Sequence, residues 1–239
     1  GGNGMRCLVT GGTGFVGSYL IAQLRSEGHA VDLLGRSGGQ AAIRADLGTG
    51  VPELPERGYD VVYHVAGKAH VVPRTGAERQ AFFDVNTAGT KHLLDSLDAQ
   101  DRMAGAFVLV SSVAVYGREA GEGLDEETPC VATDPYGLSK RQAEEVVLDW
   151  GRQRGVRVGI VRLPLVAGAG APGNLGAMVR AIRRGRYFGV GGGTARRSVV
   201  LVADVARVLP RVAEQGGIYN LTDGRHPSFA EIERAVAAA

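Results

Sequence analysis

A tyrosine and a lysine four residues apart are the side chains in this sequence best suited to acid–base chemistry. Tyr136 and Lys140 stand where a helical pattern begins, so both lie on one helix face, one turn apart. A phenol with a pKa near ~10 carries protons poorly at neutral pH, and a nearby ammonium would lower that pKa. The alternative interpretation is an ordinary pair on a helix surface, because the spacing is common by chance.

A serine hydroxyl adds a second group that could act on a substrate. Ser112 follows the segment 106–111, five apolar residues and a serine, which has the composition of a buried strand. At the carboxyl end of such a strand, the hydroxyl could donate a hydrogen bond to a substrate carbonyl. We therefore predict that Ser112, Tyr136 and Lys140 form one catalytic set.

A glycine-rich turn precedes these residues in the chain. Gly11, Gly14 and Gly17 are spaced by three between a predicted strand, 6–10, and a predicted helix, 14–27. Gly11 permits a tight turn, Gly14 lets a pyrophosphate approach the backbone, and Gly17 allows close helix–sheet packing. A purely structural glycine turn is the alternative. The predicted dinucleotide contacts in this segment come from Gly11, Thr13, Gly14, Phe15, Val16 and Gly17.

The end of the second predicted strand, 30–34, bears on the choice of cofactor. An acidic residue there would bind a ribose 2′-hydroxyl, but Gly35 occupies the position and Arg36 follows it. A guanidinium can form charge-assisted bonds to a 2′-phosphate, which favours NADP(H), with NAD(H) as the alternative. Asp46, followed by Leu47, could accept a hydrogen bond from the adenine amino group or could be a turn residue.

Strands that alternate with helices must position these groups. Further strands are predicted at 61–65, 106–111 and 156–161, with helices through Leu93, Leu94 and Leu97 and over 139–154. The pattern predicts an α/β fold, a doubly wound parallel Rossmann-like sheet that binds its ligand beyond the carboxyl ends of the strands. We expect a dinucleotide-binding domain over 5–165. A small substrate-binding lobe over 166–239 is expected to follow, from which one strand could return to the main sheet.

The composition excludes several classes of function. The 239-residue chain carries a formal charge of +2, so no strong field favours a nucleic acid or a membrane as partner. No apolar stretch approaches the ~20 residues that span a bilayer, and no secretory signal is visible. Cys7 and Cys130 form no disulfide pattern, so we predict a cytoplasmic protein. His64 and His70 have no third ligand at metal spacing, and no metal site is predicted.

Taken together, these segments resemble the extended short-chain dehydrogenase/reductases, and among them the sugar-nucleotide epimerases and reductases. The likeness covers essentially the whole chain. It is carried by Thr10–Gly17, His64-Val65-Ala66, Asn86 with Gly89-Thr90, Ser111–Gly117, Glu127-Thr128-Pro129 before Asp134-Pro135-Tyr136, and Lys140.

The resemblance implies a role for individual residues. Tyr136 would be the general acid/base, Ser112 would polarise the substrate carbonyl or hydroxyl, and Lys140 would lower the pKa of the phenol and hold the nicotinamide ribose. Asn86 and the backbone of Val65 and Ala66 would line the cofactor cleft. In the second lobe, Asn174, Leu175 and Arg197 look like residues that bind the diphosphate of a nucleotide-sugar substrate. A homodimer, formed by two helices from each subunit, is also implied.

The type of reaction follows from departures within the family. Dehydratases place an acid pair after the active-site hydroxyl, where this chain has Val113 and Ala114, so elimination is set aside. Some epimerases of the family carry an asparagine where this chain has Leu165. The segment 163–166 looks more like that of a bacterial surface-polysaccharide subgroup, which contains 4-ketoreductases. We expect an NAD(P)-dependent oxidoreductase acting at C4 of a nucleotide sugar, foremost a 4-ketoreductase. A 4-epimerase and a non-catalytic dinucleotide-binding protein are the alternatives.

Overall fold

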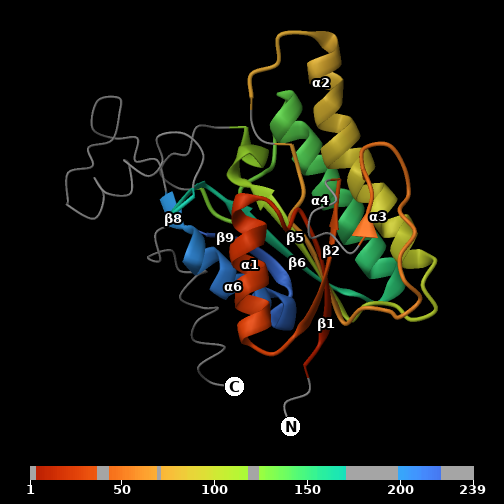
Figure 1. Cartoon of the computed structure of the whole chain (residues 1–239). Helices are drawn as coiled ribbons and strands as arrows, with labels where there is room; N and C mark the ends of the chain where they lie inside the picture. The colour runs from red at the N-terminus through yellow and green to blue at the C-terminus, as the bar shows by residue number, and fades with distance from the viewer. Residues whose placement is uncertain (1–3, 37–42, 69–70, 118–123, 171–198, 222–239) are drawn as a thin grey trace.

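A single parallel sheet forms the centre of the molecule (Figure 1). The computed structural model describes residues 4–36, 43–68, 71–117, 124–170 and 199–221. Within these residues the main sheet has seven strands in the order β3-β2-β1-β4-β5-β6-β9, and every neighbouring pair is parallel. The strands are β1 (Arg6–Thr10), β2 (Ala30–Gly35), β3 (Ile43–Arg44), β4 (Val61–His64), β5 (Ala106–Ser112), β6 (Arg157–Leu163) and β9 (Gly217–Asn220). This architecture confirms the predicted doubly wound α/β fold.

Helices cover both faces of the sheet. Figure 1 shows α1 and α6 on one side and α2, α3 and α4 on the other. Between α2 and α3 the chain forms one π-helical turn, η1, and after β5 it forms a short 3₁₀ helix, η2. The helices are α1 (Phe15–Ser26), α2 (Gly76–Phe82), η1 (Phe83–Ala88), α3 (Gly89–Asp98), η2 (Val113–Tyr116), α4 (Pro135–Arg154) and α6 (Val202–Gln215).

Alternating side chains of the strands build a separate apolar core on each face. Along β1, Cys7 and Val9 pack with the residues of α1 and α6, whereas Leu8 packs with those of α3 and α4. In β5, Phe107 meets Trp150 of α4 edge to face, with ring centroids 5.6 Å apart. Strands buried on both faces explain the nearly continuous apolar runs in the sequence.

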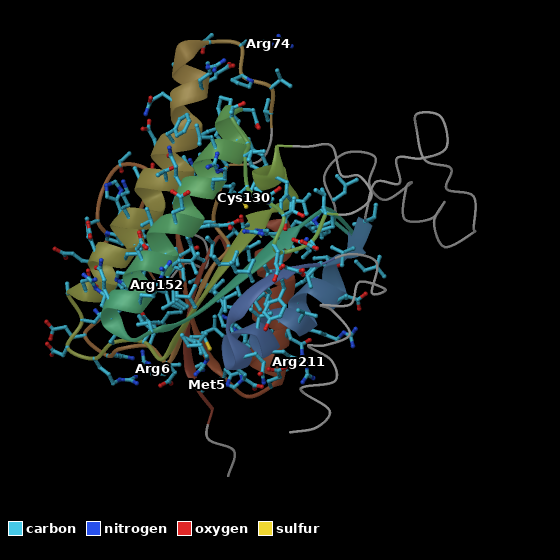
Figure 2. All side chains as sticks on the ribbon, turned by 180° about the vertical axis from the view of Figure 1, so that it is seen from behind. Met5, Arg6, Arg74, Cys130, Arg152 and Arg211 are labelled. Atoms are coloured by element: carbon cyan, nitrogen blue, oxygen red, sulfur yellow. The ribbon has the colours of Figure 1, made fainter. Side chains whose placement is uncertain are left out.

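The strand order reverses beside β1. From β1 the chain proceeds outward through β2 to β3, and then it crosses back to β4 on the other side of β1. Ligands of open α/β sheets bind at such a switch point, beyond the carboxyl ends of the strands. In the reverse view of Figure 2, Met5 and Arg6 mark the opposite, amino edge near the start of β1.

Helix α4 starts one turn before the predicted range 139–154 and so includes Tyr136, as the spacing of Tyr136 and Lys140 requires. The predicted start is residue 139, but the helix begins at Pro135, whose fixed φ and missing N–H suit a first helical position. The carboxylate of Asp134 accepts a hydrogen bond from the N–H of Gly137 at 3.0 Å and caps this end. Tyr136 therefore lies inside the first turn of the helix, held by regular backbone.

The later part of the chain returns to the main sheet. Two short strands, β7 (Leu165–Ala167) and β8 (Val199–Leu201), pair in parallel, after which α6 packs against α1 and β9 pairs with β6. The proposed division into 5–165 and 166–239 stays a prediction, because 171–198 and 222–239 lie outside the described residues. Over the described ranges, no helix is both long and apolar enough to cross a membrane.

Candidate functional site

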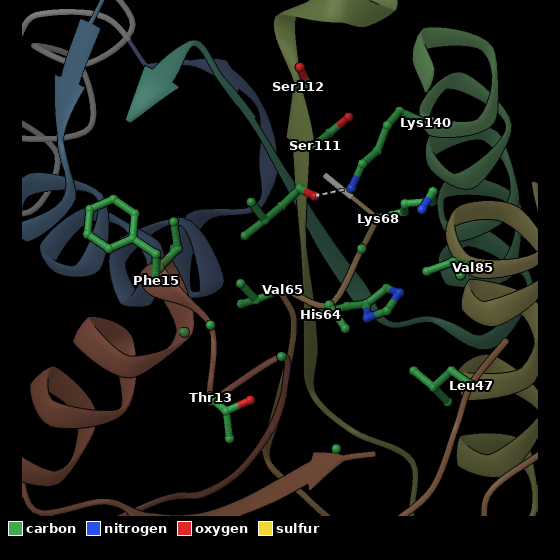
Figure 3. Close-up of a pocket in the computed structure, with 18 of the residues that line it drawn as sticks. Thr13, Phe15, Leu47, His64, Val65, Lys68, Val85, Ser111, Ser112 and Lys140 are labelled. Atoms are coloured by element: carbon green, nitrogen blue, oxygen red, sulfur yellow. Dashed lines mark hydrogen bonds between the residues drawn. The ribbon is translucent and has the colours of Figure 1, made fainter. Parts of the chain in front are cut away.

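A cavity of about 810 Å³ opens at the switch point. Its walls come from the turn after β1, the ends of β2 and β4, the end of β5, and the first turns of α4. Figure 3 shows Ser111, Ser112 and Lys140 at one end of this pocket and Thr13 and Leu47 towards the other. The volume falls within the range of about 300–1,000 Å³ that is usual for small-molecule and cofactor sites. The sequence-predicted residues in its wall are Gly11, Thr13, Gly14, Phe15, Val16, Gly17, Arg36, Asp46, Leu47, Val65, Ala66, Ser112, Tyr136 and Lys140.

The glycine turn has no room for side chains at two of its three key positions. Gly11 has a φ of +70°, and a Cβ there would lie 2.7 Å from the amide nitrogen of Ala66. A Cβ on Gly17 would lie 2.1 Å from the carbonyl oxygen of Gly11. At Gly14 the nearest atom would be 3.2 Å away, which is tight but not excluded by the protein itself. The turn is thus in close contact with the backbone that follows β4 and with α1.

The start of α1 offers backbone donors to an anion. Gly14 is the N-cap and has no side chain to cap the helix, and the first turn contains no acidic residue. The first N–H groups of a helix lack intrahelical partners and carry the positive end of the helix dipole. Since these groups face a pocket, the turn fits the pyrophosphate of a dinucleotide.

The far end of the pocket is lined by Arg36 and Asp46. Arg36 is exposed and follows Gly35 at the end of β2. Asp46 has the contacts of a turn residue, since its Oδ1 accepts the N–H of Gly48 at 2.9 Å. Its place on the pocket wall is compatible with an adenine contact as well.

The predicted catalytic side chains meet at the opposite end. Ser112 ends β5, and its Oγ accepts the N–H of Ala114 at 3.0 Å. A hydrogen bond joins Ser112 to Tyr136, whose ring also packs edge to face on Phe82 with centroids 6.0 Å apart. Lys140, only 7% exposed, lies one turn further along α4, and its Nζ donates to the carbonyl oxygen of Val110 at 3.4 Å (Figure 3).

The pKa of Tyr136 shifts opposite to the direction expected from the sequence. Burial raises the pKa of this phenol, and the hydrogen bond from Ser112 opposes the rise only in part. Lys140 is not among the groups that lower it, and Asp134 raises it further. Burial also lowers the pKa of Lys140 to about 8, against the smaller opposing effect of Glu144. Tyr136 is therefore a neutral phenol at neutral pH, whereas Lys140 is largely an ammonium.

Asn86, predicted to line the cofactor cleft, is not among the residues of the pocket wall; it is 2% exposed on the π-helical turn and reaches that wall through the backbone of Lys68. Its side chain accepts the N–H of Lys68 at 2.9 Å and donates to Ser139 Oγ at 3.1 Å. A Cβ on Gly67 would lie 2.7 Å from Lys140 Nζ and 3.1 Å from Asn86 Oδ1, so both side chains crowd the backbone after β4. A π-helical insertion of this kind is typical of functional sites.

A buried ion pair connects β6 with α4 beside Ser111, the neighbour of Ser112 in β5. Glu144 and Arg162 are each 5% exposed, and their closest atoms are 2.6 Å apart. Ser111 donates to the same carboxylate at 2.6 Å, while Arg162 donates to the hydroxyl of Tyr116 at 2.9 Å. This network ties the end of β5, next to Ser112, to the helix that carries Tyr136.

Some pocket residues were absent from the sequence prediction. Gly67 and Lys68 directly follow Val65 and Ala66, so an extension of that segment would have found them. Val85 also lines the pocket. The predicted substrate contacts Asn174, Leu175 and Arg197 lie outside the described residues. Over those that are described, no group of three or more His, Cys, Asp or Glu side chains could hold a metal ion.

Comparison with known proteins agrees with this geometry. The chain is 30% identical to the UDP-glucose 4-epimerase of Vibrio cholerae, over 97% of this chain and 75% of that protein. It is 31% identical to the GDP-6-deoxy-D-mannose reductase of Pseudomonas aeruginosa, over 97% and 79%. The solved structure of RMD from Pseudomonas aeruginosa complexed with NADPH superposes with a TM-score of 0.72 at 28% identity, covering 98% of this chain and 84% of that one.

The family model described as "NAD dependent epimerase/dehydratase family" matches residues 7–222. The match spans the glycine turn, the Ser112–Tyr136–Lys140 end of the pocket and the returning strand β9. The chain belongs to this NAD(P)-binding family of extended short-chain dehydrogenase/reductases, as the sequence resemblance predicted.

Proposed function

We propose that this protein is an NAD(P)-dependent oxidoreductase that acts at C4 of a nucleotide sugar, foremost as a 4-ketoreductase. The observation that carries the proposal is the opening of Ser112, Tyr136 and Lys140 onto the same pocket as the glycine turn. A nicotinamide bound there supplies a hydride donor or acceptor. The relatives named above, a 4-epimerase and a reductase of sugar nucleotides, support the substrate class.

The protonation states suit the reductive direction. Tyr136, with its pKa raised by burial, begins as a phenol and can deliver a proton to the substrate oxygen. Ser112 can donate a hydrogen bond to that oxygen as negative charge develops on it. The ammonium of Lys140, in the wall of the same pocket, is suited to hold the ribose of the nicotinamide, as the family resemblance implies.

A preference for NADP(H) forms the finer part of the proposal. Arg36, exposed at the wall of the pocket, is suited to a 2′-phosphate, and Gly35 leaves no carboxylate where a ribose 2′-hydroxyl would be bound. NAD(H) is the alternative cofactor.

The second candidate function is a nucleotide-sugar 4-epimerase. It is favoured by the similarity to the UDP-glucose 4-epimerase over nearly the whole chain. Both reactions use the same three side chains. They differ in whether the reduced dinucleotide is consumed in each cycle.

We further propose that the protein is a cytoplasmic homodimer. The family resemblance supports the dimer, and the free thiols of Cys7 and Cys130 are compatible with a reducing compartment. Light scattering on the purified chain would test the dimer.

An absorbance assay with NADH and NADPH against a set of 4-keto sugar nucleotides tests the reaction. Consumption of the reduced dinucleotide supports the reductase, and interconversion of 4-epimers without net consumption supports the epimerase. Tyr136→Phe should bind dinucleotide like the wild type and lose about 10²–10⁴-fold in turnover. Tyr219→Phe is the matched control, because this phenol lies on β9, outside the pocket wall, and donates to the carbonyl oxygen of Gly216 at the end of α6. Near-normal activity of Tyr136→Phe would refute the assignment.

A further inference from the structure

A buried histidine connects three segments of the cofactor pocket. His64 ends β4 and is 2% exposed. Its Nδ1 lies 2.7 Å from Thr10 Oγ1, and its Nε2 lies 2.9 Å from Thr90 Oγ1. With both ring nitrogens engaged by hydroxyls, the side chain is neither a metal ligand nor a passive apolar filler.

The hydrogen bonds of Thr90 determine which hydrogen stands on Nε2. Thr90 Oγ1 donates its single hydrogen to the carbonyl oxygen of Asn86 at 2.7 Å. The hydroxyl can then only accept from the ring. Nε2 of His64 must therefore carry a hydrogen.

The hydrogen bonds of Thr10 determine the state of Nδ1 in the same way. Thr10 Oγ1 accepts the N–H of Val65 and the N–H of Ala66, each at 3.1 Å. Both lone pairs of this oxygen are thus used, so its own hydrogen points to Nδ1 of His64, which must be an acceptor. The ring is therefore neutral. Burial and the charge of Lys140 agree, since they lower the pKa of His64 to about 3.

Each end of this chain of hydrogen bonds reaches the cofactor pocket. Thr10 precedes Gly11, whose backbone is pressed against that of Ala66. At the other end, Thr90 donates to the carbonyl oxygen of Asn86 in the π-helical turn. The side chain of the same Asn86 accepts the N–H of Lys68 in the pocket wall. One imidazole thus holds the glycine turn, the end of β4 and the Asn86 turn in a fixed relation.

We propose that His64, as the neutral Nε2–H tautomer, is a positioning residue that fixes the spacing between the glycine turn and the Asn86 turn, and thereby the width of the dinucleotide cleft. The inference rests on the cofactor site proposed above. It adds that dinucleotide affinity depends on a side chain that makes no contact with the reacting atoms.

Variants at His64 separate its two hydrogen bonds. His64→Asn places an acceptor near the position of Nδ1 for Thr10 but offers nothing to Thr90. His64→Gln reaches towards Thr90 and loses the bond from Thr10, whereas His64→Phe keeps a ring and removes both. Thr90→Val removes the partner of Nε2 while leaving the histidine in place. His29→Asn is the control, because His29 accepts the N–H of Met5 at the opposite edge of the sheet.

The measurements are dinucleotide affinity, melting temperature and nitrogen-15 NMR of the histidine rings. We expect Kd values for NADPH and NADH about tenfold higher in His64→Asn, His64→Gln and Thr90→Val, because each takes one hydrogen-bond partner away from a buried polar group. His64→Phe should be weaker still. His29→Asn should keep the wild-type Kd even if it melts earlier. In the wild type, the resonances that disappear in His64→Asn should report an Nε2–H ring at neutral pH.

Three results would overturn the inference. In the first, His64→Asn and Thr90→Val fold and bind dinucleotide with the Kd of the wild type but melt at a lower temperature. His64 would then contribute to stability only. Another is a protonated or Nδ1–H ring at neutral pH, which the NMR experiment detects even if His64→Phe does not fold. A wild type that binds neither dinucleotide would refute the cofactor site itself, and this outcome is distinguishable from the other two.

Discussion

Replacing Gly17 with alanine tests whether the close contact between the glycine turn and α1 is needed for cofactor binding. The added Cβ would lie 2.1 Å from the carbonyl oxygen of Gly11 and 2.8 Å from both its carbonyl carbon and the Cα of Gly12. All three are backbone atoms and cannot rotate out of the way. Ordinary van der Waals contact begins at 3.4 Å, so the helix and the turn must separate by at least about 1.3 Å to restore it.

The size of the effect follows from two opposing contributions. Alanine within a helix is favoured over glycine by about 1 kcal/mol. Overpacking costs about 1–3 kcal/mol, and the short distances to backbone at Gly17 put it at the upper end. We expect the free energy of unfolding to fall by about 1–2 kcal/mol. N–H···O bonds span only about 2.7–3.2 Å, so a displacement of this size should also raise the Kd for NADPH at least about tenfold.

Gly76→Ala provides the matched control. Gly76 is the first residue of α2, and a Cβ there meets no atom within 4 Å. Chemical denaturation and fluorescence titration with NADPH would be performed on both variants. If Gly17→Ala matches Gly76→Ala in stability and in affinity, the reasoning about the turn is wrong.

Two further predictions concern buried charge. The pKa of His64 falls from 6.5 to about 3 on folding, so the unfolded chain binds more protons between these values. Stability should therefore drop by about 1.4 kcal/mol per unit as the pH falls through this window. Urea denaturation at a series of pH values should show a steeper slope in this window for the wild type than for His64→Asn, because carboxylates such as Asp60, whose pKa folding also lowers, contribute equally to both. Glu144→Ala leaves Arg162 buried without its carboxylate and should cost about 3–5 kcal/mol. Asp149→Ala, which removes an exposed partner of Arg152, should cost less than about 1 kcal/mol in the same assay.

Much of the sheet could be predicted from the sequence because its strands are buried on both faces. The apolar runs of β1, β4, β5 and β6 lie within a few residues of their predicted bounds. The two-residue strand β3 was missed, since so short a segment has no pattern. The start of α4 was misplaced because Asp134-Pro135 was not recognised as a cap and a first helical residue.

Several residues of the candidate site could be predicted from the sequence, but their pKa values could not, because these depend on burial and on neighbours far away in the chain. Residue types and order identified Tyr136, Lys140 and Ser112, which line one pocket. Spacing along a helix suggested that Lys140 would lower the pKa of Tyr136, but it cannot report how deeply the phenol is buried. The π-helical turn at Asn86 packs against α4, and no local sequence pattern predicts it.

The pairing of β7 with β8 has a consequence for how such a protein could diversify. Leu165 is in register with Val199 and Ala167 with Leu201. The described segments on either side of residues 171–198 are therefore held next to each other by the pairing of β7 with β8. Lengthening a connection between fixed anchors costs only on the order of 0.6 kcal/mol per doubling of its length. A change in the number of residues between Ala167 and Val199 should therefore leave β9 and the dinucleotide pocket in place.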